Sequence, residues 1–170
     1  MRVFQIEGDW GMANLKLSQR AQPVPAPGQV LLRMKASSLN FRDLVVPDRG
    51  YGNYTGNLPL IPISDGVGEV VAVGEGVTRT KVGDRVCPTF FQNWIAGEPD
   101  LERLTQSLGG PIDGTMAEYM CLSEQGVVPG GTKTNLEHAS KGVIFPDGLP
   151  DAIKHVLADA QTNGGLLAAV

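Results

Sequence analysis

The chain has 170 residues, of which 42% are hydrophobic and 19% are charged, and its formal net charge is −4. These proportions are typical of a globular protein and exclude a largely disordered one. The acidic balance, without a long Lys/Arg cluster, argues against nucleic acid as a partner.

No apolar run approaches the roughly 18 residues that a membrane-spanning helix needs, so no membrane partner is expected. The charged N-terminus, Met1–Glu7, lacks the apolar core of a signal peptide. Cys87 and Cys121 are far apart and not in CxxC spacing, which is typical of a reducing compartment. These features predict a soluble, cytoplasmic protein.

Alternating side chains predict the first strand at Val30–Ala36, with Leu32, Met34 and Ala36 on one face and Leu31, Arg33 and Lys35 on the wet face. Ser37–Val46 is expected to be a loop that runs into a short helical turn, which Pro47 ends.

Further strands are predicted at Gly66–Val73, Arg85–Pro88 and Met116–Leu122, while residues 90–113 lack periodicity and form a long excursion. The 22 Gly and 12 Pro residues indicate many tight turns between short strands. The pattern therefore predicts a mainly β fold, a barrel or a sandwich.

After Val128 the pattern changes. Leu149–Asn163 is predicted to be a helix, because Pro150 suits its first turn and apolar residues recur at helical spacing. Leu166–Val170 is expected to be a buried strand.

Four motifs occur together in the first part of the chain. They are Ala36-Ser-Ser-Leu-Asn40-Phe-Arg-Asp43, the Gly50-Tyr51 turn, Ile63-Ser-Asp-Gly-Val-Gly68 and Val82-Gly-Asp-Arg-Val86. As a set they resemble the GroES-like catalytic domain of zinc-free medium-chain dehydrogenases/reductases, the quinone oxidoreductase branch. The resemblance implies a GroES-like β-barrel over residues 1–128.

Zinc is not expected by this resemblance. Zinc-dependent relatives place a Cys where Asn40 stands and a His where Ser64 stands, and neither Asn nor Ser is a competent zinc ligand. The cysteines of the structural zinc lobe are also missing, since residues 90–113 contain no Cys.

The same resemblance implies a substrate pocket beside the nicotinamide. Asn40 and Tyr51 would orient a carbonyl or amide edge there, with Asp43 and Ser64 as secondary candidates. Two simpler alternatives stay open: Asn40 caps the following helical turn, and Tyr51 is an aromatic residue of the barrel rim. Asp65 is expected to pair with a backbone group or an Arg rather than to act as a base.

The family's nucleotide-binding domain has no counterpart in the sequence. Neither Gly66-Val-Gly68 nor Gly74-Glu-Gly76 opens a helix in a βαβ unit, so the dinucleotide fingerprint fails in both places. No cofactor is therefore expected for this chain, although the parent family uses NADPH, and no residue is assigned a catalytic role.

The tail resembles a different family. Three pieces resemble the C-terminal region of selenophosphate synthase, without the part that activates ATP: Val128-Pro-Gly-Gly-Thr-Lys-Thr-Asn135, Leu149-Pro150-Asp151 and Leu157–Val170. We expect a fusion, engineered or accidental, joined at Val127–Gly130, in which residues 129–170 supply a helix and a strand that complete the barrel.

Three functions follow from these expectations. The leading one is a non-catalytic substrate-domain remnant of an NADPH-dependent zinc-free alcohol dehydrogenase or quinone oxidoreductase. In the second, another chain supplies the nucleotide-binding domain and restores oxidoreductase activity. In the third, the barrel is a non-enzymatic module that self-associates through the former nucleotide-domain interface.

Overall fold

The computed structural model describes residues 1–94, 102 and 105–128, of which all but Val128 belong to the unit Met1–Val127. The predicted helix and strand at Leu149–Asn163 and Leu166–Val170 lie outside these residues, as does the second unit, Val128–Val170, apart from its first residue.

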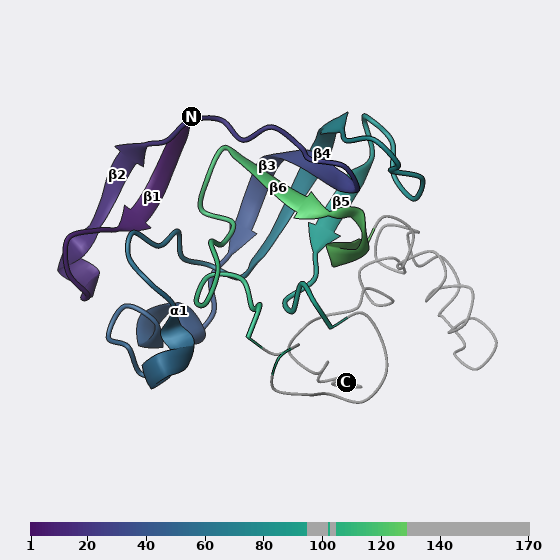
Figure 1. Ribbon diagram of the computed structural model, residues 1–170. Coiled ribbons are helices and arrows are strands. Elements are labelled where there is room, and N and C mark those ends of the chain that lie inside the picture. The colour runs from purple at the N-terminus through teal and green to yellow at the C-terminus, as the bar shows by residue number, and fades with distance from the viewer. Residues whose placement is uncertain (95–101, 103–104, 129–170) are drawn as a thin grey trace, which may run out of the picture. The chain divides into compact units, whose positions relative to one another are not determined.

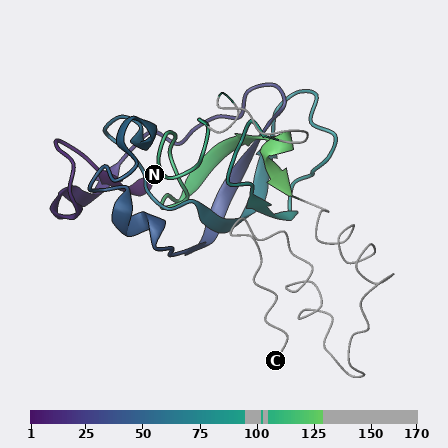
Figure 2. The same cartoon turned by 90° about the horizontal axis from the view of Figure 1, so that it is seen from below.

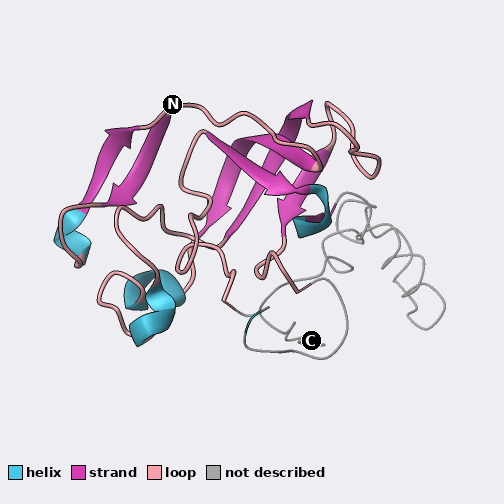
Figure 3. Ribbon diagram, viewed as in Figure 1, coloured by secondary structure: helices cyan, strands magenta, loops and turns pink. Residues whose placement is uncertain are grey.

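The described part is mainly β, as predicted (Figures 1 and 3). Its strands are β1 (Arg2–Ile6), β2 (Leu15–Gln19), β3 (Gln29–Ser38), β4 (Asp65–Val73), β5 (Arg85–Pro88), β6 (Tyr119–Ser123) and β7 (Val127–Val128). Its helical segments are α1 (Arg42–Val45) and the 3-10 turns η1 (Met12–Asn14), η2 (Gly52–Thr55) and η3 (Glu124–Gly126). None of them has the length and apolar character needed to cross a membrane, within the ranges that are described.

The strands form two sheets. β1 and β2 make an antiparallel hairpin, which Figure 2 shows to one side of the larger sheet. The larger sheet has five strands in the order β6-β3-β4-β5-β7. Within residues 1–94 and 105–128 this order does not close into a ring, so the barrel is not confirmed.

Strand β3 lies at the centre of this arrangement because it pairs with β4 on one side and with β6 on the other. Its pairing with β4 shifts register at Leu31/Leu32 and at Met34/Ala36. These irregularities break the predicted alternation. Leu31 is buried along with Leu32, whereas Ala36 is exposed; the prediction for these two residues was wrong.

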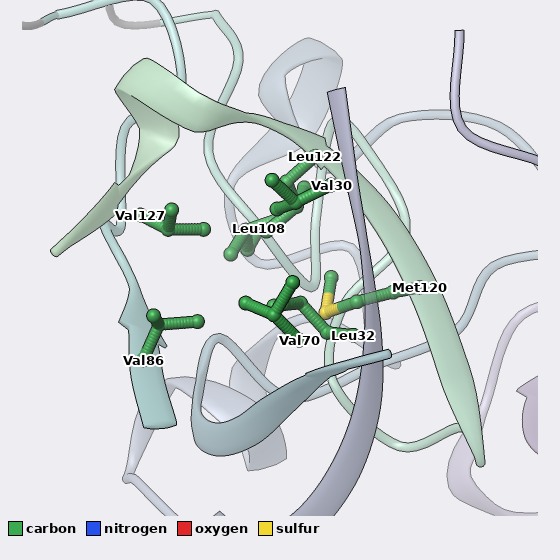
Figure 4. Close-up of a cluster of buried hydrophobic side chains, with 8 residues drawn as sticks. All are labelled: Val30, Leu32, Val70, Val86, Leu108, Met120, Leu122 and Val127. Atoms are coloured by element: carbon green, nitrogen blue, oxygen red, sulfur yellow. The ribbon is translucent and has the colours of Figure 1, made fainter. Parts of the chain in front are cut away.

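One apolar core joins all five strands of the larger sheet. Figure 4 shows its side chains pointing toward one another: Val30, Leu32, Val70, Val86, Leu108, Met120, Leu122 and Val127. Leu108 comes from the segment expected to be an excursion, and it is completely buried. Leu108 therefore packs into the core, and further along the chain Thr115 contacts Ser37 near the end of β3.

Candidate functional site

Two of the residues predicted from the motifs meet at one carboxylate oxygen. Asn40 Nδ2 donates to Oδ2 of Asp65 at 2.6 Å, and Ser64 Oγ donates to the same oxygen at 2.6 Å. They meet because β3 and β4 are antiparallel, with Ser38 opposite Asp65 in the register. The end of one strand and the start of the next thus bring Asn40 and Ser64 to the same edge of the sheet.

Asp65 is the residue that sequence reasoning undervalued. We expected it to pair with a backbone group or an Arg, yet its carboxylate accepts from an amide and a hydroxyl. Its backbone carbonyl also accepts a hydrogen bond of 3.0 Å from the hydroxyl of Thr115, a completely buried residue. The signal available in the sequence was its position directly after Ser64 within the motif.

Asp43 contacts the same cluster through the backbone. Its Oδ2 accepts from the main-chain N–H of Asn40 at 2.7 Å, the reach-back contact of a helix-capping box. The carboxyl is buried, and its Oδ1 has no hydrogen-bond partner in the described part of the chain. Burial raises the pKa of Asp43, while the Asn40 N–H lowers it and the neighbouring charge of Asp65 raises it.

The alternative role of Asn40 as a helix cap stays open. Phe41 stands at the N-cap position assigned to α1 and forms no side-chain cap bond, whereas the reach-back contact of Asp43 treats Asn40 as the cap residue. The side-chain amide of Asn40 also bonds to Asp65 and, at 3.5 Å, to the carbonyl of Ser38.

Tyr51 belongs to a neighbouring group. The guanidinium of Arg42 lies 4.9 Å from the Tyr51 ring and 5.1 Å from the Phe90 ring, distances suited to cation–π contacts. Arg42 also donates to the hydroxyl of Ser107 at 3.3 Å. Tyr51 is thus linked to the cluster through Arg42, which precedes Asp43 in the chain and, against the rise that burial causes, lowers the pKa of its carboxyl by its charge. The rim role of Tyr51 stays open.

The backbone before Ser64 is held in an unusual conformation. Ile63 has a φ of 72°, which is rare for a β-branched residue. The segment 109–115 stabilises it: Thr115 N–H donates to the Ile63 carbonyl at 2.8 Å, and Gly109 packs directly against the Ile63 backbone. This strained residue lies immediately before Ser64 and Asp65, two members of the cluster.

A hollow of about 600 Å³ lies beside the cluster rather than on it. Its lining includes Ser37, Ile63 and Thr115, along with apolar residues of β1, β2 and β3, but none of Asn40, Asp43, Tyr51 or Ser64. Ser37 and Thr115 hydrogen-bond to each other through their hydroxyls at 3.0 Å. The hydrogen bond of Thr115 to the Asp65 carbonyl makes this wall of the hollow continuous with the cluster.

The described side chains form no group of candidate metal ligands. In residues 1–94, 102 and 105–128, no three His, Cys, Asp or Glu side chains are grouped so that they could hold a metal ion. The cluster itself supplies an amide, a hydroxyl and a carboxylate. Cys121 is half-buried, and burial raises the pKa of its thiol, the opposite of what an activated nucleophile requires.

Comparison with known proteins identifies the first part of the chain. Residues 26–132 match the family model of the alcohol dehydrogenase GroES-like domain. A zinc-type alcohol dehydrogenase-like protein of Schizosaccharomyces pombe is 36% identical over 121 residues, which cover 71% of this chain and 32% of that protein. A crystal structure from Sinorhizobium meliloti, described as an alcohol dehydrogenase, is 32% identical with a TM-score of 0.66; the match covers 83% of this chain and 46% of that one.

A second similarity concerns another family, as the sequence predicted. The selenide, water dikinase of Myxococcus xanthus is 67% identical over 71 residues, which are 42% of this chain and 18% of the dikinase. These 71 residues outnumber the 42 residues from Pro129 to Val170, so the match also includes part of the chain before Pro129. The chain spans less than a third of these curated relatives and under half of the solved structure.

Proposed function

The chain belongs to the alcohol dehydrogenase GroES-like domain family, and on that premise we propose that it is the substrate-side domain of an alcohol dehydrogenase or quinone oxidoreductase, fused to a selenophosphate synthase-like tail. The observation that carries the proposal is the shared bond of Asn40 and Ser64 to Asp65. It brings together, at the sheet edge, the two positions that zinc-dependent relatives use for metal ligands.

We propose that a substrate binds at this cluster, beside the hollow, without zinc. Zinc in proteins is held by thiolate, imidazole and carboxylate groups. Here the described cluster offers no thiolate or imidazole, and the Asp65 carboxylate already accepts two hydrogen bonds at one oxygen, while the Asp43 carboxylate accepts the Asn40 main-chain N–H. Fixed hydrogen-bonding groups would then orient a substrate that a metal ion orients in other members of the family.

We further propose that the chain alone transfers no hydride. The nicotinamide of NADPH, when bound, supplies the hydride, and the protein binds and orients the reactants. The strand pairs recorded for β1 to β6 are antiparallel. The helix α1 has only four residues, too few for the helix of a βαβ unit. A dinucleotide site of the βαβ kind is therefore not formed by these residues.

The alternative in which another chain supplies the nucleotide-binding domain makes use of the same pocket. In that case Asn40, Tyr51, Asp43 and Ser64 would face the cofactor only in the complex. Recovery of NADPH-dependent reduction on addition of the partner would separate it from the non-catalytic remnant.

A second candidate function is self-association, and one feature favours it. Three apolar side chains that lie close together in the sequence, around Asn40 and Asp43, are exposed to solvent. The exposed fractions are 76% for Leu39, 79% for Phe41 and 59% for Leu44. Apolar side chains grouped in this way are typical of a contact surface. We propose that this segment, Leu39–Leu44, is where the former nucleotide-domain interface lies and where copies of the chain would associate.

We also propose that residues 129–170 complete a GroES-like barrel and that the protein is cytoplasmic, without a nucleic-acid or membrane partner. The open order of the five-stranded sheet, the widely separated thiols and the net charge of −4 support these points.

A titration followed by nuclear magnetic resonance tests the pocket. Cyclohexanol and cyclohexanone, added separately to the ¹⁵N-labelled 170-residue chain, should shift the resonances of Asn40, Ser64 and Asp65 in a saturable way. Saturable shifts confined to residues far from this cluster would contradict the proposed site.

A further inference from the structure

The chemistry of Asp65 determines which way the Asn40 amide points. A carboxylate accepts hydrogen bonds and does not donate them, so the group of Asn40 that faces it at 2.6 Å must be the NH₂. The second hydrogen of this NH₂ is directed at the Ser38 carbonyl, 3.5 Å away. Both donors of the amide therefore point toward the protein.

Asp65 is itself held at both ends. Ser64, which is only 2% exposed, donates to its carboxylate, while the buried Thr115 donates to its backbone carbonyl. Asp65 also begins β4, opposite Ser38 at the end of β3. These contacts leave the carboxylate little freedom to rotate away from Asn40.

The backbone of Asn40 is fixed independently of its side chain. The carboxylate of Asp43 accepts the Asn40 main-chain N–H at 2.7 Å. Two carboxylates thus hold one residue, Asp43 at the backbone and Asp65 at the amide. Asn40 remains partly exposed between the exposed side chains of Leu39 and Phe41, so its segment is accessible from solvent.

From this geometry we propose that Asp65 is a positioning residue that makes Asn40 an acceptor toward the ligand. An amide oxygen has two lone pairs and can accept a ligand hydrogen alongside a protein donor. The pocket then favours a ligand group that donates, a hydroxyl or an N–H, over a bare carbonyl. This inference rests on the proposed function and reverses the expectation that Asn40 orients a carbonyl.

The first test needs no ligand. In the ¹⁵N spectrum of the whole chain, the Asn40 side-chain NH₂ should give two well-separated proton resonances that exchange slowly. Asp65→Ala should move them to the values of a solvated amide and speed their exchange with water. Asp65→Asn keeps an acceptor oxygen at the same place and should restore the parent values, whereas Glu75→Ala, at an exposed turn, should change nothing.

The second test compares two ligands that differ only in the reacting group. Cyclohexanol should bind the parent chain about fivefold more tightly than cyclohexanone, the scale of one net hydrogen bond. Asp65→Ala should bring this ratio close to one, and Asp65→Asn should keep it. Asn40→Ala removes the amide oxygen and should also abolish the preference, which covers the case in which Asp65→Ala does not fold.

The outcomes separate this inference from its premise. Equal or tighter binding of the ketone to the parent chain, or an unchanged ratio in Asp65→Ala and Asn40→Ala, overturns the inference while the pocket stands. If neither ligand shifts the resonances of Asn40 and Ser64, the proposed binding of a substrate at the cluster is wrong, and the inference fails with it.

Discussion

The side-chain nitrogen of Asn40 lies 2.6 Å from Oδ2 of Asp65, 25 residues further along the chain. This contact joins the end of β3 to the start of β4 and defines the site in the described part of the protein. The stability of its surroundings can be tested separately from its binding properties.

The close approach of Gly109 to Ile63 should be essential for the strained backbone before Ser64. A Cβ at Gly109 would lie 2.6–2.8 Å from Ile63 backbone atoms, too close to be accommodated. Gly109→Ala should therefore destabilise the fold strongly and broaden the resonances of Ser64 and Asp65. Urea denaturation with a spectrum of the folded state measures both effects.

Gly76→Ala is the matched control, because Gly76 has a similar positive φ but open space around it. It should cost only the conformational strain of about 1–2 kcal/mol. Equal losses in the two variants would show that contact with Ile63 is unimportant.

The buried carboxylate of Glu124 should make stability depend on pH. Its Oε2 accepts main-chain N–H groups of Arg79 at 2.7 Å and Thr78 at 2.9 Å, and these bonds hold the pKa of Glu124 below its ordinary value of 4.5. A pKa lowered by folding means stabilisation that is present above the unfolded pKa and lost as pH falls through the folded one.

Glu124→Gln should accordingly be less stable than the parent chain at pH 7, and the difference should shrink as the pH falls below about 4.5. Urea denaturation at several pH values between 7 and 3 measures this difference. Glu75→Gln, at an exposed position, serves as the control. A difference that stays constant over this range would rule out the assigned role of the carboxylate.

Strands β3, β4 and β5 could be predicted because their residues alternate or are rich in Val and are bounded by Gly-containing turns. The hairpin of β1 and β2 was not predicted, since its strands are separated by eight residues, which include a 3-10 turn, instead of a short turn signal. Motif positions led us to predict Asn40 and Ser64 as members of one site, and the structure shows that both side chains bond to Asp65. Their shared carboxylate depends on the β3–β4 register with its two irregularities, which local patterns do not determine.

The exposed segment Leu39–Leu44 should govern any self-association. Phe41→Glu places a charge on a side chain that is 79% exposed and should lower the weight-average mass measured by light scattering, with little change in the melting temperature. Val24→Glu is the matched control because Val24 is 84% exposed and lies elsewhere in the chain. A parent chain that is strictly monomeric at all concentrations argues against this function.

The tail should contribute to the folding of the residues before it. The predicted helix carries an apolar stripe formed by Ile153, Val156 and Leu157, and burial of such side chains contributes about 1.5–3 kcal/mol each. A chain that ends at Val128 should therefore aggregate or melt at a lower temperature than the whole chain. Cooperative unfolding of the shortened chain at an unchanged temperature would show that the tail is dispensable.

The central claim is that this chain holds a substrate pocket and not the cofactor half of a reductase. Titration of NADPH against the fluorescence of Trp10 and Trp94 in the 170-residue chain tests it most directly. We expect a linear inner-filter decrease that free tryptophan reproduces. Saturable quenching beyond that decrease would demonstrate a dinucleotide site in the chain itself and contradict the account.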